Sequence, residues 1–249
     1  MRILILGGNG MIGHQLLNSW EGKYDVMVTL RESLDNYAFS GLFNINNTYP
    51  EVDATRLDTI ENVLQTYRPE TVVNAIGITK QLATPENTRS IIQVNALFPH
   101  QLAELCEQYE CRLVHLSTDC VFSGDDGNYT EASTSDARDT YGRTKYLGEV
   151  SAGHVVTLRK STIGLELNNP HGLVEWFLSQ QGRIRGYQGA IYSGLISSEL
   201  ANVIEDILVV HTELHGLWHV ASQPINKYDL LTGLSSRLGR SDIEIEPDE

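Results

Sequence analysis

The sequence predicts an α/β fold in which a doubly wound parallel sheet carries a smaller C-terminal lobe. An apolar run at residues 2–6 leads through a glycine turn into an amphipathic helix. Short apolar runs then alternate with helical patterns as far as residue 116, which is typical of a parallel sheet with helices on both faces. After Arg159 the alternation gives way to loops and short apolar segments, which indicates a second unit.

Each predicted element rests on its own pattern of apolar residues. A strand covered on both faces is continuously apolar, whereas a helix repeats apolar residues three and four positions apart. The first pattern predicts strands at residues 2–6, 25–30, 71–75, 112–116, 155–158 and 217–220. The second predicts helices at residues 11–20, 56–67, 90–109, 141–152, 195–210 and 227–238. The polar stretch 32–50 and the terminal residues 243–249 show no helix pattern, and no element is assigned to them.

The change of pattern after Arg159 defines the predicted domains. Residues 1–159 form the larger unit, to which residues 191–221 return with one more helix and strand. Residues 160–190 and 222–249 form the smaller lobe.

Composition narrows the class of protein. The chain of 249 residues has 32 Asp and Glu against 18 Lys and Arg, a net charge of −14. This acidic excess argues against binding to nucleic acid or to an anionic membrane, both of which need a basic surface, but it allows a small phosphate ligand. The chain has three cysteines without a CxxC pair, no secretory signal and no apolar run of about 18 residues or more. We therefore expect a soluble cytoplasmic protein without disulfides, membrane segments or a metal site.

The glycines between the first strand and the first helix predict a dinucleotide-binding turn of the Rossmann type. Gly7 permits a tight turn, Gly10 lets the backbone approach a pyrophosphate, and Gly13 lets the helix pack closely on the strand. The N-terminus of the helix adds free amides and a partial positive charge. A structural βα turn without a ligand is the alternative interpretation.

Arg31, just after the second strand, bears on the choice of cofactor. An acidic residue there would bind the 2′-hydroxyl of NAD, whereas an arginine pairs with the 2′-phosphate of NADP. The sequence therefore favours NADPH, with NADH possible, and an exposed Arg31 without a partner is the alternative. Further cofactor contacts are expected from Met11, Ile12, Asp53, Asn74, Ala75 and Gly77.

Tyr141 and Lys145 are four residues apart and therefore lie on one face of a predicted helix. A tyrosine with an ordinary pKa near 10 is a poor acid at neutral pH, but a neighbouring ammonium lowers that pKa. Such a pair is often only a solvated helix face. Its position adds weight, because it follows a strand that ends at Ser117 and Thr118, and ligands bind at the carboxyl ends of strands in open parallel sheets.

Together these motifs resemble the extended short-chain dehydrogenase/reductase superfamily. The resemblance rests on the glycine turn, on Asn74-Ala75, on STDCVFSG at residues 117–124 and on the Tyr141–Lys145 pair. Within the superfamily, STDxVFxG, GNYTE at 127–131 and YGRTKxxGE at 141–149 are similar to the dTDP-4-dehydrorhamnose reductase family of sugar-nucleotide 4-keto reductases. The similarity extends through GLWHVA at 216–221 and so covers nearly the whole chain.

The resemblance implies a role for each catalytic residue. Tyr141 would donate a proton to the C4 ketone, and Lys145 would bind the nicotinamide ribose and lower the Tyr141 pKa. Thr118 would polarise the carbonyl, with Ser117 the weaker candidate for this role. The nicotinamide supplies the hydride. Asn95 would either support Lys145 through water or serve only in packing.

This chain departs from the family at Cys120, where an aromatic residue is usual. We expect Cys120 to form part of the substrate wall as an inert thiol, because no histidine is placed to activate it as a nucleophile. The related 4,6-dehydratases have a second carboxylate at this position, which performs water elimination. Its absence here favours simple reduction.

The family binds its nucleotide sugar between the two lobes. Candidate contacts are residues whose side chains can grip a diphosphate or stack on a ring, namely Arg159, Ser161, His171, Trp176, Arg185, Tyr187 and Ser193. For each, a structural role is the alternative, such as lobe core for Trp176 or a surface ion pair for Arg185. The segment His171–Phe177 is similar to relatives that act on UDP-linked 2-acetamido-6-deoxy-4-ketohexoses.

These observations lead to one hypothesis and three alternatives. The hypothesis is an NADPH-dependent reductase of a nucleotide-linked 4-keto-6-deoxy sugar that serves polysaccharide, O-antigen or capsule synthesis. The alternatives are a UDP-2-acetamido-6-deoxy-4-ketohexose reductase, a sugar-nucleotide epimerase or dehydratase with bound NAD⁺, and a non-catalytic dinucleotide-binding regulatory subunit. A homodimer is possible, and relatives usually continue for some tens of residues beyond this C-terminus. Because the ligands are anionic, the cleft should be locally positive on an otherwise acidic protein.

Overall fold

The computed structural model describes residues 1–167 and 172–249. In this part of the chain, seven parallel strands form the main sheet in the order β11-β6-β5-β4-β1-β2-β3. Their bounds are β1 Arg2–Leu6, β2 Asp25–Thr29, β3 Thr48–Tyr49, β4 Thr71–Asn74, β5 Arg112–Leu116, β6 Val155–Lys160 and β11 Gly216–Val220. All six strands predicted from apolar runs are present, and β3 is an addition from the polar stretch that had no assignment.

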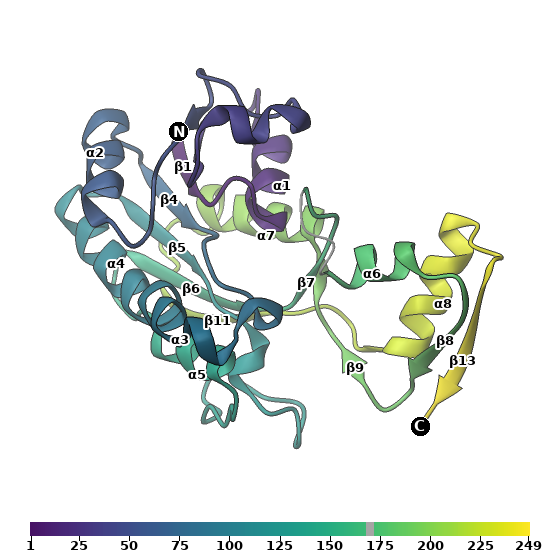
Figure 1. Cartoon of the computed structure of the whole chain (residues 1–249). Coiled ribbons are helices and arrows are strands. Elements are labelled where there is room, and N and C mark those ends of the chain that lie inside the picture. The colour runs from purple at the N-terminus through teal and green to yellow at the C-terminus, as the bar shows by residue number, and fades with distance from the viewer. Residues whose placement is uncertain (168–171) are drawn as a thin grey trace.

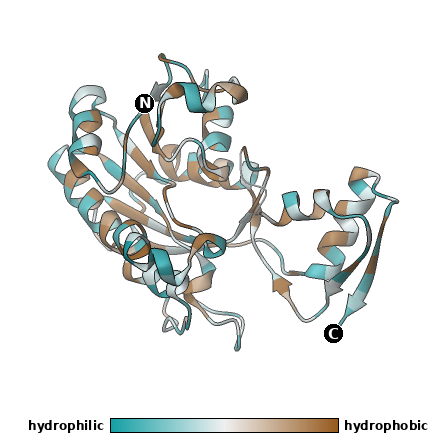
Figure 2. Cartoon of the chain, in the orientation of Figure 1, coloured by the Kyte–Doolittle hydropathy of each residue, from teal (hydrophilic) through white to brown (hydrophobic). Residues whose placement is uncertain are grey.

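Helices cover both faces of this sheet, as the prediction of a doubly wound fold requires (Figure 1). On one face, α1 (Met11–Trp20) and α7 (Ser197–Val209) pack against the strands, with Leu16, Trp20 and Ile204 fully buried. On the other face, α2 (Leu57–Tyr67) and α4 (Phe98–Gln108) enclose a second core. Figure 2 shows hydrophobic residues along the strands between these two helix layers. Burial on both faces explains why the strands are continuously apolar.

Two predicted helices differ from the structure. The expected helix at 90–109 is divided into α3 (Thr88–Ile91), a π-helical turn at Ile92–Leu97 and α4. The expected helix at 141–152 is α5 (Thr140–Leu147), which stops at Gly148. A β-carbon on Gly148 would lie 2.0 Å from the carbonyl oxygen of Asn95 in the π-helical turn. The end of α5 is therefore set by a close backbone approach that the local sequence pattern does not reveal.

Short 3₁₀ helices connect the larger elements. The first, η1 (Leu34–Ser40), follows β2 and lies in the polar stretch without an assigned element. The others follow the carboxyl ends of β4 and β5 and are η2 (Lys80–Leu82), η3 (Pro85–Asn87) and η5 (Asp119–Val121). These segments carry residues of the candidate site.

The last part of the chain builds a smaller lobe with its own core (Figure 1). It contains α6 (Leu173–Ser179) and α8 (Lys227–Leu238), and β8 (Gly182–Tyr187) pairs with β13 (Ile243–Asp248). Its core consists of Phe177, Ile184, Leu231 and Ile243. Two further strand pairs are β7 (Thr162–Ile163) with β10 (Leu195–Ile196), and β9 (Ile191–Tyr192) with β12 (Ile225–Asn226). The domain boundaries at 159/160, 190/191 and 221/222 stay a prediction.

Among the described residues, no helix combines the length and apolar character needed to cross a membrane. The same residues contain no group of three or more His, Cys, Asp or Glu side chains arranged to hold a metal ion.

Candidate active site

The glycine turn has the geometry that its three glycines were predicted to permit. Gly7 has a φ of 85°, and a β-carbon on Gly13 would lie 2.1 Å from the Gly7 carbonyl oxygen. Both positions therefore require glycine for reasons internal to the protein. Gly10 differs, because its nearest neighbour would be 3.5 Å from an added β-carbon. No protein atom requires a glycine there, which leaves the space open to a ligand.

The turn leaves backbone amides available at the start of α1. Gly10 is the N-cap residue, no side chain caps the helix, and no acidic residue lies in its first turn, which includes Met11 and Ile12. Uncapped amides and the positive end of the helix dipole together favour an anion. The turn is held beside β2 by hydrogen bonds from the Gly8 amide to the Thr29 carbonyl oxygen (2.9 Å) and from the Gly7 amide to Thr29 Oγ1 (3.2 Å).

The predicted cofactor residues line up along the carboxyl ends of neighbouring strands. Arg31 follows β2, and its side chain is 73% exposed with Glu32 3.8 Å away, so its guanidinium is largely open to solvent. Asp53 follows β3 and accepts hydrogen bonds from the Thr55 amide (2.8 Å) and hydroxyl (2.9 Å). The Ala75 amide donates to the Leu6 carbonyl oxygen (3.1 Å), which places the end of β4, followed by Gly77, beside the glycine turn.

Two asparagines near this edge hold the backbone. The Asn74 side chain is fully buried, accepts from the Ile76 amide (3.1 Å) and lies 3.1 Å from His115 Nδ1. Asn95 uses both ends of its amide on Ile78, accepting from its N–H at 2.8 Å and donating to its carbonyl oxygen at 2.9 Å. The structure therefore favours the packing role of Asn95 over a water-mediated link to the lysine.

Thr118 and Tyr141 come together at the carboxyl end of β5. Thr118 is buried, and its hydroxyl donates to Asp119 Oδ1 (3.2 Å) and accepts from the Cys120 amide (3.2 Å). Burial raises the pKa of Tyr141 to about 12, and the nearby Thr118 hydroxyl acts in the opposite direction. A β-carbon on Gly142 would lie 2.2 Å from the Cys120 carbonyl oxygen, so α5 packs closely on η5 and holds the pair together.

Lys145 lies one turn along α5 from Tyr141. Its ammonium donates a hydrogen bond to the Leu116 carbonyl oxygen at 2.6 Å. The largest causes of the Tyr141 pKa shift are burial, which raises the pKa, Thr118, which lowers it, and the nearby groups of Cys120, Asp119 and Asp139, which raise it. Lys145 itself has a pKa lowered to about 7, first by burial and then by the charge of Lys160, while Glu149 opposes the shift. The Tyr141 pKa is therefore raised and not lowered in this structure, because burial has the largest effect on it, and the role predicted for Lys145 stays a prediction.

Ser117 and Arg159 lie on the other face of the sheet from Thr118. Arg159 forms two hydrogen bonds of 2.7 Å with the Glu149 carboxylate, and these side chains are only 4% and 9% exposed. Ser117 donates to the same carboxylate at 2.8 Å. The structure does not bring either residue to Tyr141, because successive residues of a strand point to opposite faces. Both side chains are bonded to the Glu149 carboxylate, and their contact with substrate stays a prediction.

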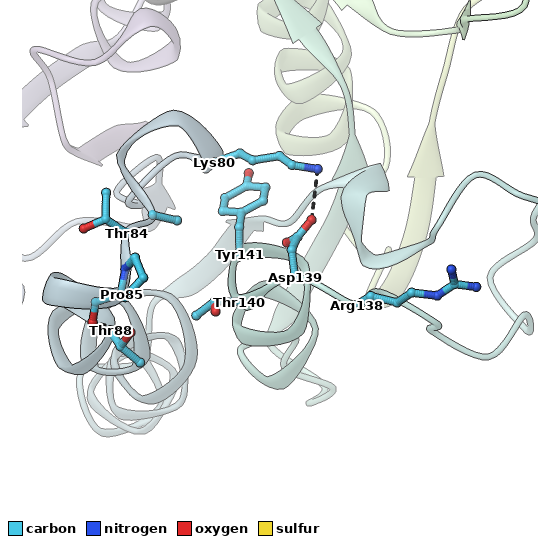
Figure 3. Close-up of a pocket in the computed structure, with 9 residues that line it drawn as sticks. Lys80, Thr84, Pro85, Thr88, Arg138, Asp139, Thr140 and Tyr141 are labelled. Atoms are coloured by element: carbon cyan, nitrogen blue, oxygen red, sulfur yellow. Dashed lines mark hydrogen bonds and ion pairs between the residues drawn. The ribbon is translucent and has the colours of Figure 1, made fainter.

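A pocket of about 420 Å³ opens beside Tyr141 (Figure 3). Its wall includes Lys80, which forms a salt bridge with Asp139 at 2.9 Å. Asp139 also caps α5 by accepting from the Gly142 amide at 2.7 Å. The rest of the wall is mostly threonine and other polar or small residues, namely Ala83, Thr84, Pro85, Thr88, Arg138 and Thr140. Cys120 is part-buried nearby, and burial raises the pKa of its thiol, which agrees with an inert role.

Sequence reasoning missed Lys80, Asp139 and Lys160 in this region. A signal existed for Asp139, because an aspartate just before a helical pattern is a typical N-cap. Lys80 begins η2, far along the chain from Asp139, so only the fold reveals their salt bridge. Lys160 directly follows Arg159 in the sequence, and only Arg159 was predicted to contact a ligand.

The predicted residues Trp176, Tyr187 and Arg185 contact other residues of the smaller lobe. Trp176 and Tyr187 flank the Lys227 ammonium, which lies 5.3 Å and 5.5 Å from their ring centres. Arg185 forms a 3.3 Å ion pair with Asp248. A surface ion pair was the alternative considered to a substrate contact for this residue.

The serines predicted with them lie where the lobe joins the sheet. The carbonyl oxygen of Ser161 accepts from the Leu195 amide (3.0 Å), and that of Ser193 accepts from the Ser222 amide (2.6 Å). His171 falls outside the described residues.

Comparisons with known proteins agree with this geometry. Residues 1–163 match the family model described as RmlD substrate binding domain. A dTDP-4-dehydrorhamnose reductase of Aggregatibacter actinomycetemcomitans is 27% identical over 242 residues, covering 92% of this chain and 76% of that protein. A dTDP-4-keto-6-deoxy-D-glucose reductase of Streptomyces niveus is 30% identical over 149 residues, covering 59% of this chain and 46% of that protein.

Solved structures match the whole fold. A dTDP-4-dehydrorhamnose reductase of Bacillus anthracis, in complex with NADP, superposes with a TM-score of 0.78 at 22% identity, covering 100% of this chain and 84% of that one. The enzyme WbmG of Bordetella bronchiseptica, in complex with NAD, superposes with a TM-score of 0.76 at 18% identity, covering 100% of this chain and 82% of that one. At these identities the likeness shows the shared fold.

Proposed function

Since this chain belongs to the RmlD substrate binding domain family, we propose that it catalyses the NADPH-dependent reduction of the C4 ketone of a nucleotide-linked 4-keto-6-deoxy sugar. The observation that carries the proposal is the neighbouring pair of Thr118 and Tyr141, which stands at the carboxyl end of β5 beside a polar pocket. Ligands of open parallel sheets bind at this edge. The relatives named as reductases of dTDP-linked keto sugars support the reaction type.

The residues present fit a dinucleotide. The uncapped start of α1 offers amides to a pyrophosphate, Gly10 leaves room for it, and Arg31 offers a cation beyond β2. When bound, the reduced nicotinamide supplies the hydride.

The protein supplies a proton and orientation. With a pKa raised to about 12, Tyr141 is fully protonated at neutral pH and serves as a proton donor to the ketone oxygen. Thr118 is a neighbour of that hydroxyl and would orient the same oxygen. Lys145, whose Nζ donates to the Leu116 carbonyl oxygen, would bind the ribose of the cofactor.

The nucleotide sugar is proposed to bind between the carboxyl edge of the sheet and the smaller lobe. Residues 1–159 with 191–221 form the cofactor unit in this proposal, and residues 160–190 with 222–249 form the substrate lobe. Cys120, Trp176, Arg185 and Tyr187 remain proposed substrate contacts. The net charge of −14 supports an enzyme that works without nucleic acid. A cytoplasmic location and a homodimer remain part of the proposal.

Arg31 is expected to select NADPH over NADH. Replacement by alanine removes a charge-assisted hydrogen bond to the 2′-phosphate, and it should raise the NADPH Kd about tenfold or more. The NADH Kd should stay within about twofold, because NADH has no such phosphate. Fluorescence titration of both cofactors measures this. Arg183→Ala, which removes an arginine of similar exposure (71%) in the lobe, is the matched control. Equal weakening of both cofactors would contradict the assignment.

The proposed reaction is tested by following NADPH oxidation with dTDP- and UDP-linked 4-keto-6-deoxy sugars, with and without a 2-acetamido group. We expect oxidation that depends on the sugar and on one preferred base. If NADPH binds but no sugar is reduced, and another enzyme co-purifies, the chain is a regulatory subunit. Purified protein that carries tightly bound NAD⁺ would instead indicate an epimerase or dehydratase.

A further inference from the structure

Lys160 is the last residue of β6 and lies on the same face of the sheet as Thr118. Leu116 of β5 pairs with Leu158 of β6, and both side chains lie in the core formed with α1 and α7. Thr118, whose backbone is extended, and Lys160 each follow two residues later and so face the same side. Arg159, between Leu158 and Lys160, points to the opposite face. The fold thus places Lys160 on the face of the sheet that carries Thr118, near Asp119 and Cys120 of η5.

The Lys160 ammonium differs from the other cations of the site in having no bonded partner. Lys145 donates to a carbonyl oxygen, Lys80 pairs with Asp139, and Arg159 pairs with Glu149. Within the described part of the chain, Lys160 has neither a side-chain hydrogen bond nor a salt bridge, and its side chain is part-buried. Its ammonium is not among the buried atoms that lack a hydrogen-bond partner and so keeps access to solvent, which leaves it free to bond a ligand that enters the site.

We propose that Lys160 contacts the substrate, an inference that rests on the proposed function. Its ammonium donates a hydrogen bond to a sugar oxygen at a position of the ring next to the ketone. Its position favours the sugar over the pyrophosphate of the cofactor. In the sheet order β6-β5-β4-β1, three strand spacings, or about 14 Å, separate β6 from the glycine turn. Reduction builds negative charge on the ketone oxygen, and a cation held nearby stabilises that charge.

The charged groups around Lys160 set its behaviour with pH. Asp119 and Cys120 face it from η5, and Lys145 faces it from α5. Burial lowers the pKa of Lys160 to about 8, and Asp119 and then Cys120 oppose this shift. Glu149 acts in turn on Lys145, and Lys80 acts on Cys120. Lys160 is therefore charged below pH 8, and it makes Lys145 easier to deprotonate. Without Lys160, the pKa of Lys145 should rise.

Lys160→Met tests the proposal through kcat/KM, its pH profile and ligand binding. We expect kcat/KM for the ketosugar nucleotide to fall about 100-fold, as on loss of one donor to a developing oxyanion, with the NADPH Kd unchanged within about threefold. The alkaline limb of the pH profile should move to higher pH, because Lys145 has lost its repelling neighbour. Lys160→Gln, which keeps a donor without the charge, should lose less activity. Lys23→Met removes an exposed lysine paired with Glu205 and is the matched control.

Binding measured by calorimetry separates this proposal from the proposed function. Lys160→Met should weaken the dTDP- or UDP-linked ketosugar at least about tenfold but leave free dTDP or UDP unaffected. Equal weakening of sugar nucleotide and free nucleotide would place the ammonium on the diphosphate, and a raised NADPH Kd would place it on the cofactor. Either result overturns the proposal. It is also overturned if Lys160→Met binds the ketosugar nucleotide as the wild type does and the alkaline limb of its kcat/KM profile does not move. A failure of the proposed function is detected by a different result, namely that the wild-type protein reduces none of the sugar nucleotides.

Discussion

Tyr141→Phe is expected to lower kcat by about 100- to 10,000-fold while the NADPH Kd changes by less than about threefold. The substitution removes only the hydroxyl, and with it the proton that neutralises charge on the ketone oxygen. Because burial raises the Tyr141 pKa to about 12, the wild-type tyrosine keeps its proton throughout the neutral range. The kcat of the wild type should therefore show no titration of this group below about pH 10.

The measurement is steady-state NADPH oxidation, combined with fluorescence titration of NADPH. Tyr146→Phe is the matched control, since Tyr146 lies on the same helix with its side chain exposed. It should retain kcat within about twofold, as expected of a surface change. A Tyr141→Phe protein that turns over at the wild-type rate would show that the proton comes from another group, and it would remove the central step of the mechanism.

Arg159→Leu is expected to reduce the free energy of unfolding by about 3–5 kcal/mol. The substitution leaves the Glu149 carboxylate buried without its cation, with only Ser117 still donating to it. An uncompensated buried charge is far more costly than the loss of an exposed pair. Replacing both Arg159 and Glu149 by leucine should recover much of the loss, because no charge then remains buried.

Urea denaturation at neutral pH measures this effect. Arg183→Leu, which removes an exposed arginine paired with Glu244, should change the free energy of unfolding by less than about 1 kcal/mol. The experiment also distinguishes the two roles considered for Arg159. If Arg159→Leu kept full stability but lost affinity for the sugar nucleotide, the residue would contact substrate as first predicted, and the structural role would be wrong.

The fold was predictable where one short segment carries the whole pattern. The first strand, the glycine turn and the helix at 11–20 form within the first 20 residues, and the structure has them at the predicted positions. The strand at 112–116 and the helix at 227–238 were equally clear, because their apolar patterns are uninterrupted. The end of α5 was misplaced because the backbone of Asn95, some 50 residues earlier, stops the helix.

The candidate site was predictable only in part. The motif around Tyr141 identified Thr118, Tyr141 and Lys145 as neighbours, and strand alternation separates Thr118 from Ser117. Glu149 belongs to the same motif, yet its pairing with Arg159 depends on how β6 lies against β5. Electrostatics were the least predictable, since the pKa of a buried tyrosine depends on how completely the fold excludes water.

The expected local positive charge has a physical basis in the structure. Lys80, Lys145 and Lys160 all approach the end of β5, although the chain as a whole is strongly acidic. Asp119 and Asp139 stand among them and reduce the local excess. An anionic ligand therefore meets cations at a few defined positions rather than a broad basic surface.

The separate core of the smaller lobe has a consequence for how such a protein can evolve. Phe177, Ile184, Leu231 and Ile243 contact one another, while the cores beneath the sheet are built from other residues. Mutations that reshape the lobe therefore leave the packing of the sheet intact, and they can accumulate without unfolding the cofactor half. In the proposed function the lobe contacts the sugar, so remodelling the lobe would change the sugar that is bound while the hydride chemistry stays the same.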